Sequence, residues 1–342
     1  MQTEEIRRII TGSEYDFLRT NPNLGENIIA ILPGGSYAYG TNVETSDLDL
    51  RGIAMNSKKN IYSRMDFEQV VEMNTDTTIY SFDKIIKLFC ECNPNTIEML
   101  GIDLQKTPVT SRFFEAILAN KKMFLSKRAA ETFGGYAGSQ LRRMENKAAR
   151  ELGQEQRETF ILRSIQSAMY TFHERYAKFP EESLHLYVDA TNREGYDSEI
   201  FMDVCMKHYP LRDYESLWSD MNAIVKSYNK IGKRNERAIE KDKLGKHMMH
   251  LIRLYYMCFD ILEREEVITY REKEHDLLMD IRNNKYLDEN SQPVPEFYEM
   301  VDALEKRLAY DRENTSLPER CDMERVREFQ ADMNESFVKE GV

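Results

Sequence analysis

Apolar and polar positions follow two different patterns along this chain of 342 residues. In the front part, short apolar runs stand between turn-favouring residues, a pattern typical of buried strands. Beyond about residue 110, apolar residues recur every three or four positions over long segments, a pattern typical of amphipathic helices. The sequence therefore predicts an α+β protein, in which a mixed sheet with helices is followed by an all-helical domain.

The front part is expected to combine strands with two helices. An opening helix is predicted over residues 4–20, and a second over 82–92. Ser81 is the predicted N-cap of the second helix, because its hydroxyl can accept an otherwise unpaired backbone N–H. The segment Asn93-Pro94-Asn95 should end that helix. Strands are predicted at residues 28–32, 47–55, 67–73 and 77–81.

The helical part is expected to begin after a loop at residues 103–108, the best candidate for a domain boundary. A chain of this length exceeds the usual size of a single hydrophobic core. We therefore predict two domains, a catalytic domain at 1–108 and a helical domain at 109–342. Long helices are predicted at residues 126–152, 155–176, 211–240 and 245–263.

Composition narrows the class of protein. The formal net charge of −12 argues against broad, nonspecific binding of duplex nucleic acid, which depends on many Lys and Arg contacts to phosphate. Five cysteines without C-x-x-C spacing are expected to be reduced thiols of a cytoplasmic protein. No zinc site is expected, because the six histidines form no ligand pattern. The hydropathy pattern predicts neither a transmembrane helix nor a secretory signal.

The richest candidate for chemistry follows the first predicted strand. Gly34-Gly35-Ser36 should make a tight turn that aims backbone N–H groups and the Ser36 hydroxyl at a phosphate. Asp47 and Asp49 follow about ten residues later in an alternating segment, so both should point to one face of a strand. Two carboxylates beside a phosphate-binding turn suit a pair of Mg²⁺ ions.

Such a metal site usually needs a third carboxylate from a neighbouring strand. Asp76 is the first choice, because it opens the strand predicted at 77–81. The alternative interpretation of Asp76 is an ordinary turn residue in Asn-Thr-Asp, and the two are about equally favoured. Glu68 and Glu72 on the preceding strand, and Asp83 at the start of the following helix, are the other acidic candidates.

These residues resemble the nucleotidyltransferase superfamily that includes DNA polymerase beta, whose pattern is Gly-Ser, about ten residues, and Asp-x-Asp. The longer form in this chain runs Gly-Ser-Tyr-Ala-Tyr-Gly-Thr-Asn and then Ser-Asp-Leu-Asp-Leu-Arg-Gly. It is similar to the predicted nucleotidyltransferases of the YcgL/RlaP group. The similarity covers about residues 28–285, with further blocks at 78–100, 136–141, 246–254 and 281–282.

The resemblance implies a polymerase-beta-like fold and a nucleotidyltransferase that uses two Mg²⁺ ions held by Asp47, Asp49 and Asp76. The enzyme would move a nucleoside monophosphate from an NTP, expected to be ATP, to an acceptor hydroxyl. An RNA end in a repair reaction is the favoured acceptor. The alternatives are a protein side chain, as in antitoxin-like adenylyltransferases, a small molecule, or a non-catalytic nucleotide- or RNA-binding partner. The implied nucleotide-binding residues are Gly35, Ser36, Tyr39, Arg51, Lys84, Lys246, His250 and Arg253.

The last three of these residues allow an independent argument. Lys246, His250 and Arg253 stand at i, i+4 and i+7, so one helical face carries all three. That face could offset the charge of a nucleotide, and Arg253 could bind phosphate with two hydrogen bonds. The alternative is that His250 is a packed helix residue and the two cations are surface charges. Gly245 stands where the resemblance leads us to expect Thr or Pro, so the start of this helix stays open.

Overall fold

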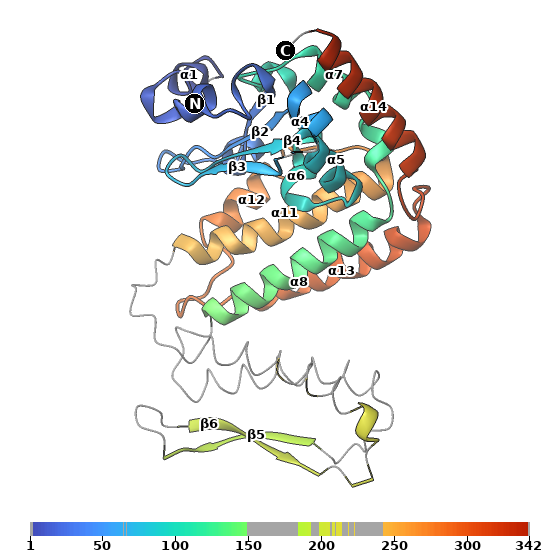
Figure 1. Cartoon of the computed structure of the whole chain (residues 1–342). Helices are drawn as coiled ribbons and strands as arrows, with labels where there is room; N and C mark the ends of the chain where they lie inside the picture. The colour runs from blue at the N-terminus through green and yellow to red at the C-terminus, as the bar shows by residue number, and fades with distance from the viewer. Residues whose placement is uncertain are drawn as a thin grey trace.

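A mixed four-stranded sheet forms the centre of the front part, in the strand order β1-β2-β4-β3 (Figure 1). β1 pairs antiparallel with β2, β2 pairs parallel with β4, and β3 pairs antiparallel with β4. The predicted mixed sheet is therefore confirmed. The strands are β1 (Ile28–Pro33), β2 (Leu50–Ala54), β3 (Gln69–Glu72) and β4 (Thr77–Ser81). The computed structural model describes residues 3–63, 65, 67–148, 184–192, 198–205, 207–208, 210–213, 218, 222 and 242–340.

The parallel pair at the middle of the sheet starts later than the sequence predicted. Its register runs from Leu50 opposite Thr77 to Ala54 opposite Ser81. Residues 46–49 precede the strand, so Asp47 and Asp49 lie on the segment that leads into β2 rather than within it. The prediction of a strand over 47–55 was wrong at its start, because an alternating polar and apolar pattern also occurs in extended chain outside a sheet.

Short helices cover one face of the sheet. The predicted opening helix is interrupted at Gly12, since α1 ends at Ile9 and a 3₁₀ turn precedes the next helical turn. Side chains of this segment, among them Ile6 and Leu18, form a hydrophobic cluster with Ile31 and Ile79 of the sheet. The elements are α1 (Thr3–Ile9), η1 (Ser13–Tyr15), α2 (Phe17–Thr20) and η2 (Gly25–Asn27).

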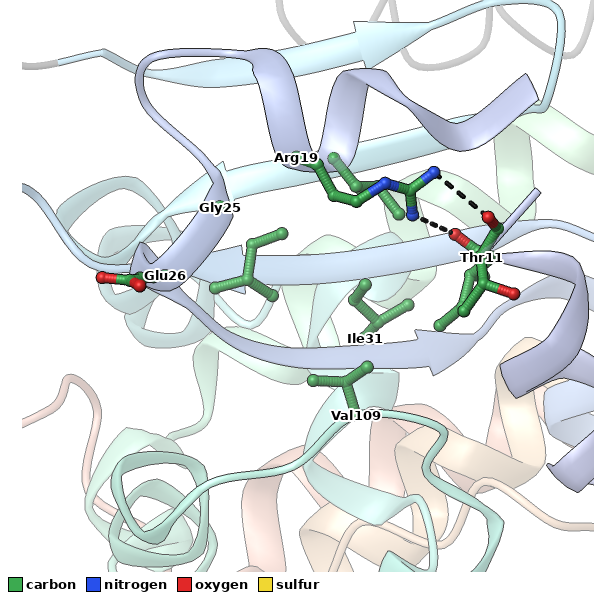
Figure 2. Close-up of a pocket in the computed structure, with 9 residues that line it drawn as sticks. Thr11, Arg19, Gly25, Glu26, Ile31 and Val109 are labelled. Carbon is green, nitrogen blue, oxygen red and sulfur yellow. Dashed lines mark hydrogen bonds between the residues drawn. The ribbon is translucent and has the colours of Figure 1, made fainter. Parts of the chain in front are cut away.

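A pocket of about 450 Å³ lies between this N-terminal segment and β1 (Figure 2). Apolar side chains such as Leu18, Ile31 and Val109 line it. Two charged residues, Arg19 and Glu26, also line it; the Arg19 guanidinium donates to the Ile10 carbonyl at 2.9 Å and pairs with Asp16 at 2.6 Å. Arg19 therefore serves to hold the turn of residues 10–16.

The other face of the sheet is covered by α5 (Phe82–Cys90) and the elements that follow it. The Ser81 hydroxyl accepts the Lys84 N–H at 3.2 Å, so the predicted N-cap is confirmed. Asn93 caps the next turn in the same way. These later elements are α6 (Pro94–Ile97), η3 (Glu98–Gly101), η4 (Leu104–Lys106), α7 (Arg112–Ala119) and η5 (Lys121–Phe124), with α4 (Lys58–Ser63) between β2 and β3.

Long helices form most of the described back part, as predicted, and α8, α11 and α13 pack against one another (Figure 1). One hydrophobic cluster combines Ile29 and Leu32 of β1 with Leu254 and Cys258 of α11. The helical region therefore shares a core with the sheet, while the boundary near residue 108 stays a prediction. The helices are α8 (Arg128–Ala148), α11 (Asp242–Arg264), α12 (His275–Arg282), α13 (Pro295–Asn314) and α14 (Met323–Lys339).

A two-stranded hairpin interrupts the predicted run of helices. β5 (Leu184–Ala190) pairs antiparallel with β6 (Ser198–Val204), with Leu184 opposite Val204. A short η7 (Leu211–Asp213) follows it. The predicted helix at 155–176 and most of that at 211–240 lie outside the described residues. No helix within the described ranges is both long and apolar enough to cross a membrane.

The start of α11 explains why a glycine stands at position 245. A Cβ built on Gly245 would lie 2.6 Å from the Arg282 carbonyl oxygen and 2.8 Å from that of Ile281. Such distances are closer than carbon and oxygen atoms can pack, so only glycine lets α11 approach the C-terminal end of α12. α11 begins at Asp242, three residues before the predicted start at 245, so Gly245 lies inside the helix, where packing rather than capping requires glycine.

We expect Gly245→Ala to destabilise the protein even though alanine is the better helix former. Overpacking of this kind costs about 1–3 kcal/mol, which exceeds the gain in helix propensity of about 1 kcal/mol. The matched control is Gly135→Ala in α8, where an added Cβ meets nothing within 4 Å. Thermal unfolding should show a lower midpoint for Gly245→Ala and a higher one for Gly135→Ala. Equal shifts would contradict the packing argument.

Candidate active site

Two carboxylates meet where β2 and β4 begin. Asp49 and Asp76 each stand one residue before the paired residues Leu50 and Thr77, and the Leu50 N–H donates to the Asp76 carbonyl at 3.2 Å. The two side chains are hydrogen-bonded to each other. Burial, this hydrogen bond and the repulsion from Asp76 raise the pKa of Asp49 to about 6. The parallel register of two strands therefore places two carboxylates side by side where β2 and β4 begin.

This pair suits a divalent cation. Adjacent carboxylate oxygens are the ligands that Mg²⁺ and Ca²⁺ take up, and a cation between them would offset their mutual repulsion. Asp47 lies two residues before Asp49 and is exposed to solvent. Over the described ranges, no three His, Cys, Asp or Glu side chains are already gathered around one point as metal ligands. The arrangement is thus a preformed pair, with Asp47 on the adjoining loop.

The other acidic candidates have different neighbours. Glu68 forms an ion pair with Lys84 at 3.0 Å. Asp83 accepts from Asn56 at 2.9 Å and from Gln330 at 2.7 Å. The structure therefore brings Asp76, the first choice of the sequence analysis, to Asp49, and it gives Glu68 and Asp83 structural contacts elsewhere.

The glycine turn lies directly against Asp49. The Gly34 N–H donates to the Asp49 carbonyl at 2.8 Å, and Gly35 begins the short helix α3 (Gly35–Tyr39) with φ of 53°. A Cβ on Gly35 would overlap the Asp49 carboxylate. Glycine is therefore required here by the neighbouring carboxylate, in addition to the backbone conformation. Ser36 follows in the first turn of this helix, beside the carboxylate pair.

An arginine of α12 holds the loop between α3 and Asp47. The Arg282 guanidinium donates to the Thr41 carbonyl at 2.8 Å and to the Ser46 hydroxyl at 3.4 Å. The same hydroxyl accepts the Val43 N–H at 2.9 Å, which closes the loop on itself. The sequence analysis included Arg282 only as part of a family block and missed this role. No local signal could reveal it, because Arg282 and Thr41 are 241 residues apart.

Two of the predicted cationic residues lie at the acidic pair. The charges of Arg51 and Lys246 both lower the pKa of Asp49, against the larger effect of burial. Arg51 also donates to the Asp76 carbonyl at 3.3 Å. Lys246 is exposed on the first turns of α11, so the helical region does contribute to the site. Lys84 is nearer the opposite end of β4, where it pairs with Glu68.

Of the remaining predicted residues, Tyr39 and Arg253 are buried, while His250 is only partly buried. Tyr39 is 1% exposed and Arg253 is 6% exposed, and the Arg253 guanidinium lies 3.3 Å from the centre of the Tyr39 ring. Arg253 Nη2 is 2.6 Å from His250 Nδ1. Lys246, His250 and Arg253 therefore do not form one exposed cationic face, because the helix turns Arg253 into the interior.

A family model described as "RlaP: RNA repair pathway DNA polymerase beta family" matches residues 13–192, more than half of the chain. The chain belongs to the RlaP family. No curated protein and no solved structure matched the chain. The matched residues include the glycine turn and all three candidate carboxylates. Lys246, Arg253 and Arg282 lie beyond them, and the structure alone places these residues at or behind the site.

We expect the acidic pair to make stability depend on pH. Because the folded-state pKa of Asp49 is raised to about 6, its stabilising contribution is complete below about pH 4 and is lost as the pH rises through 6. Asp76→Asn removes the repulsion and should raise the free energy of unfolding by about 1 kcal/mol at pH 8, after discounting for solvent screening. The difference from wild type should disappear near pH 4.

The measurement is denaturant unfolding at pH 8 and pH 4 in a chelator, so that no divalent cation offsets the repulsion. Glu289→Gln serves as the control, because Glu289 is an exposed carboxylate outside the site. A variant Asp76→Asn that is no more stable than wild type at pH 8 would show that the two carboxylates do not repel each other in solution.

Proposed function

We propose that this RlaP-family protein is a Mg²⁺-dependent nucleotidyltransferase, which moves a nucleoside monophosphate from an NTP to an acceptor hydroxyl. The observation that carries the proposal is the Asp49–Asp76 pair beside the Gly35-Ser36 turn, in a chain of a DNA polymerase beta family. A pure binding protein has no need of two carboxylates next to a phosphate group, since they would repel it unless a cation stood between them.

In this proposal Asp47, Asp49 and Asp76 are the residues that hold the cation. Bound Mg²⁺ supplies a lowered pKa at the acceptor hydroxyl and compensation for the charge on the triphosphate. The Ser36 hydroxyl and nearby backbone N–H groups bind the outer phosphates. Arg51 and Lys246 add positive charge near the phosphates. Their effect on the pKa of Asp49, which both lower, supports this placement.

The transfer itself is an in-line displacement at the α-phosphorus. The acceptor oxygen forms a bond to phosphorus while the bond to the bridging oxygen of pyrophosphate breaks. The acceptor proton goes to solvent or to a carboxylate of the site, and pyrophosphate leaves. The protein contributes position and charge rather than a covalent intermediate.

An RNA end in repair is the proposed acceptor, with ATP as the proposed donor, in a cytoplasmic enzyme. The printed description of the family, which names an RNA repair pathway, supports this acceptor. The net charge of −12 supports a second candidate, a protein side chain, because long RNA would be repelled outside the local basic groups. The same experiment distinguishes the two acceptors.

The test is incubation with each α-labelled NTP, Mg²⁺ and a cellular extract, followed by separation of RNA from protein. We expect label from one NTP to enter RNA. Asp47→Ala and Asp49→Ala should each abolish transfer, because the cation would lose a ligand. Glu289→Gln is the matched carboxylate control and should transfer like wild type. Near-normal transfer by either Asp variant would overturn the metal assignment, and labelled protein would change the acceptor.

The turn can be tested by NTP binding in a titration calorimeter. Ser36→Ala should weaken binding by about 1 kcal/mol, since a hydrogen bond to a charged group is worth about 1.5–3 kcal/mol at most. Gly35→Ala should weaken it more, because its Cβ displaces the Asp49 carboxylate. Gly34→Ala is the matched control, where the added Cβ would lie 3.4 Å from its nearest neighbours. If Gly35→Ala bound NTP as tightly as Gly34→Ala, the turn would have no part in binding.

A further inference from the structure

Arg253 is buried at the junction of the helical region and the glycine-started helix α3. Its guanidinium carbon lies 3.3 Å from the centre of the Tyr39 ring, and Tyr39 is the last residue of α3. A guanidinium over an aromatic face is an attractive contact, and it is strongest where water is excluded. Only 6% of Arg253 and 1% of Tyr39 are exposed, so the contact is a dry one.

A buried carboxylate balances this charge. Glu98 is 6% exposed and is the acidic group whose charge acts on Arg253. Burial raises the pKa of Glu98 to about 7, and the Arg253 guanidinium counteracts part of that rise. The Glu98 carbonyl also accepts the Thr269 hydroxyl at 2.6 Å. Glu98 of η3, whose charge acts on Arg253, is therefore anchored to the segment that follows α11.

The C-terminal end of α3 is fixed by two further contacts from that segment. The Arg271 N–H donates to the Tyr39 carbonyl at 3.2 Å. Gly40 has φ of 74°, and the Tyr270 ring occupies the space that a Cβ at Gly40 would need. The Tyr39 ring, the Tyr39 carbonyl and Gly40 are thus all in contact with residues of the helical region.

The opposite end of α3 lies against Asp49. The Gly34 N–H bonds to the Asp49 carbonyl, and Gly35 leaves room for the Asp49 carboxylate. Backbone hydrogen bonds from Ala38 to Gly34 and from Thr41 to Ser36 couple the two ends of α3, so a displacement at Tyr39 is passed on to the turn against Asp49. We infer that Arg253 is a positioning residue, which fixes Asp49 at the acidic pair by stacking on Tyr39 and so holding α3. The expected effect of Arg253 on turnover rests on the proposed function, whereas its effect on the position of α3 does not.

This role differs from direct binding of the nucleotide, the role that the family resemblance implied for Arg253. A residue that contacts the NTP should, when replaced, raise the dissociation constant of the NTP. A residue that places a metal-binding carboxylate should lower kcat and change NTP affinity little. The effect should also pass through Tyr39, so the two single variants and the double variant should lose the same activity.

The first measurement uses the full chain without NTP or metal. Amide hydrogen exchange at residues 34–40 should accelerate at least tenfold in Arg253→Met and in Tyr39→Leu. The control is Phe259→Leu, on the same helix but in the second hydrophobic cluster, which includes no described residue of α3. Phe259→Leu should lower the thermal midpoint and leave exchange at 34–40 unchanged. Unchanged exchange in Arg253→Met and Tyr39→Leu would overturn the inference.

The second measurement is steady-state transfer. We expect kcat to fall at least tenfold in Arg253→Met and in Tyr39→Leu, with KM for NTP within threefold of wild type. Tyr39→Phe, which keeps the ring, should restore most of the kcat lost in Tyr39→Leu. A tenfold rise in KM in Arg253→Met alone would identify a direct nucleotide contact and overturn positioning. If wild type transfers no label while the exchange results are as expected, the proposed function is wrong. The inference that Arg253 and Tyr39 hold α3 in place is then still supported.

Discussion

The parallel pairing of β2 with β4 is the constraint on which the rest of the site depends. Its register puts Leu50 opposite Thr77, so the residues just before them, Asp49 and Asp76, must lie side by side. Burial raises the pKa of Asp49, and the hydrogen bond and repulsion from the neighbouring Asp76 raise it further. The backbone hydrogen bonds of the sheet therefore hold together two groups that would otherwise separate. In the proposed function, a bound cation would offset the repulsion between these two carboxylates.

Residues outside the acidic pair hold the elements around it in place. α3 is held at its first residues by Asp49 and at its last by Arg253, Arg271 and Tyr270. Arg282 fixes the loop that carries the chain on towards Asp47. These contacts come from helices and loops of the back part, which explains why one hydrophobic cluster contains residues of both β1 and α11. The sheet supplies the carboxylates, and the helices determine where they stay.

Much of the site could be predicted from the sequence, and the errors have clear physical causes. Asp76 was found because a turn followed by a β pattern fixes the start of a strand. The start of β2 was wrong because alternation does not distinguish a strand from extended chain before it. The β5–β6 hairpin was missed although Leu184–Ala190 alternates, since helical patterns dominated on both sides. The burial of Arg253 could not be predicted. Its partner Tyr39 is far away in the sequence, so the local spacing of residues around Arg253 carries no signal of the contact.

The contact between Arg282 and Thr41 also bears on how the protein is made. The two residues are separated by 241 positions, so the ribosome must add that much chain between them, which takes at least about ten seconds. During that interval the nascent chain already carries both aspartates and the glycine turn, and the loop between them has no anchor. Contacts so distant in sequence form late, because closing a long loop is entropically costly. Interrupted synthesis would thus leave fragments that carry the acidic motif without the Arg282 contact that anchors its loop.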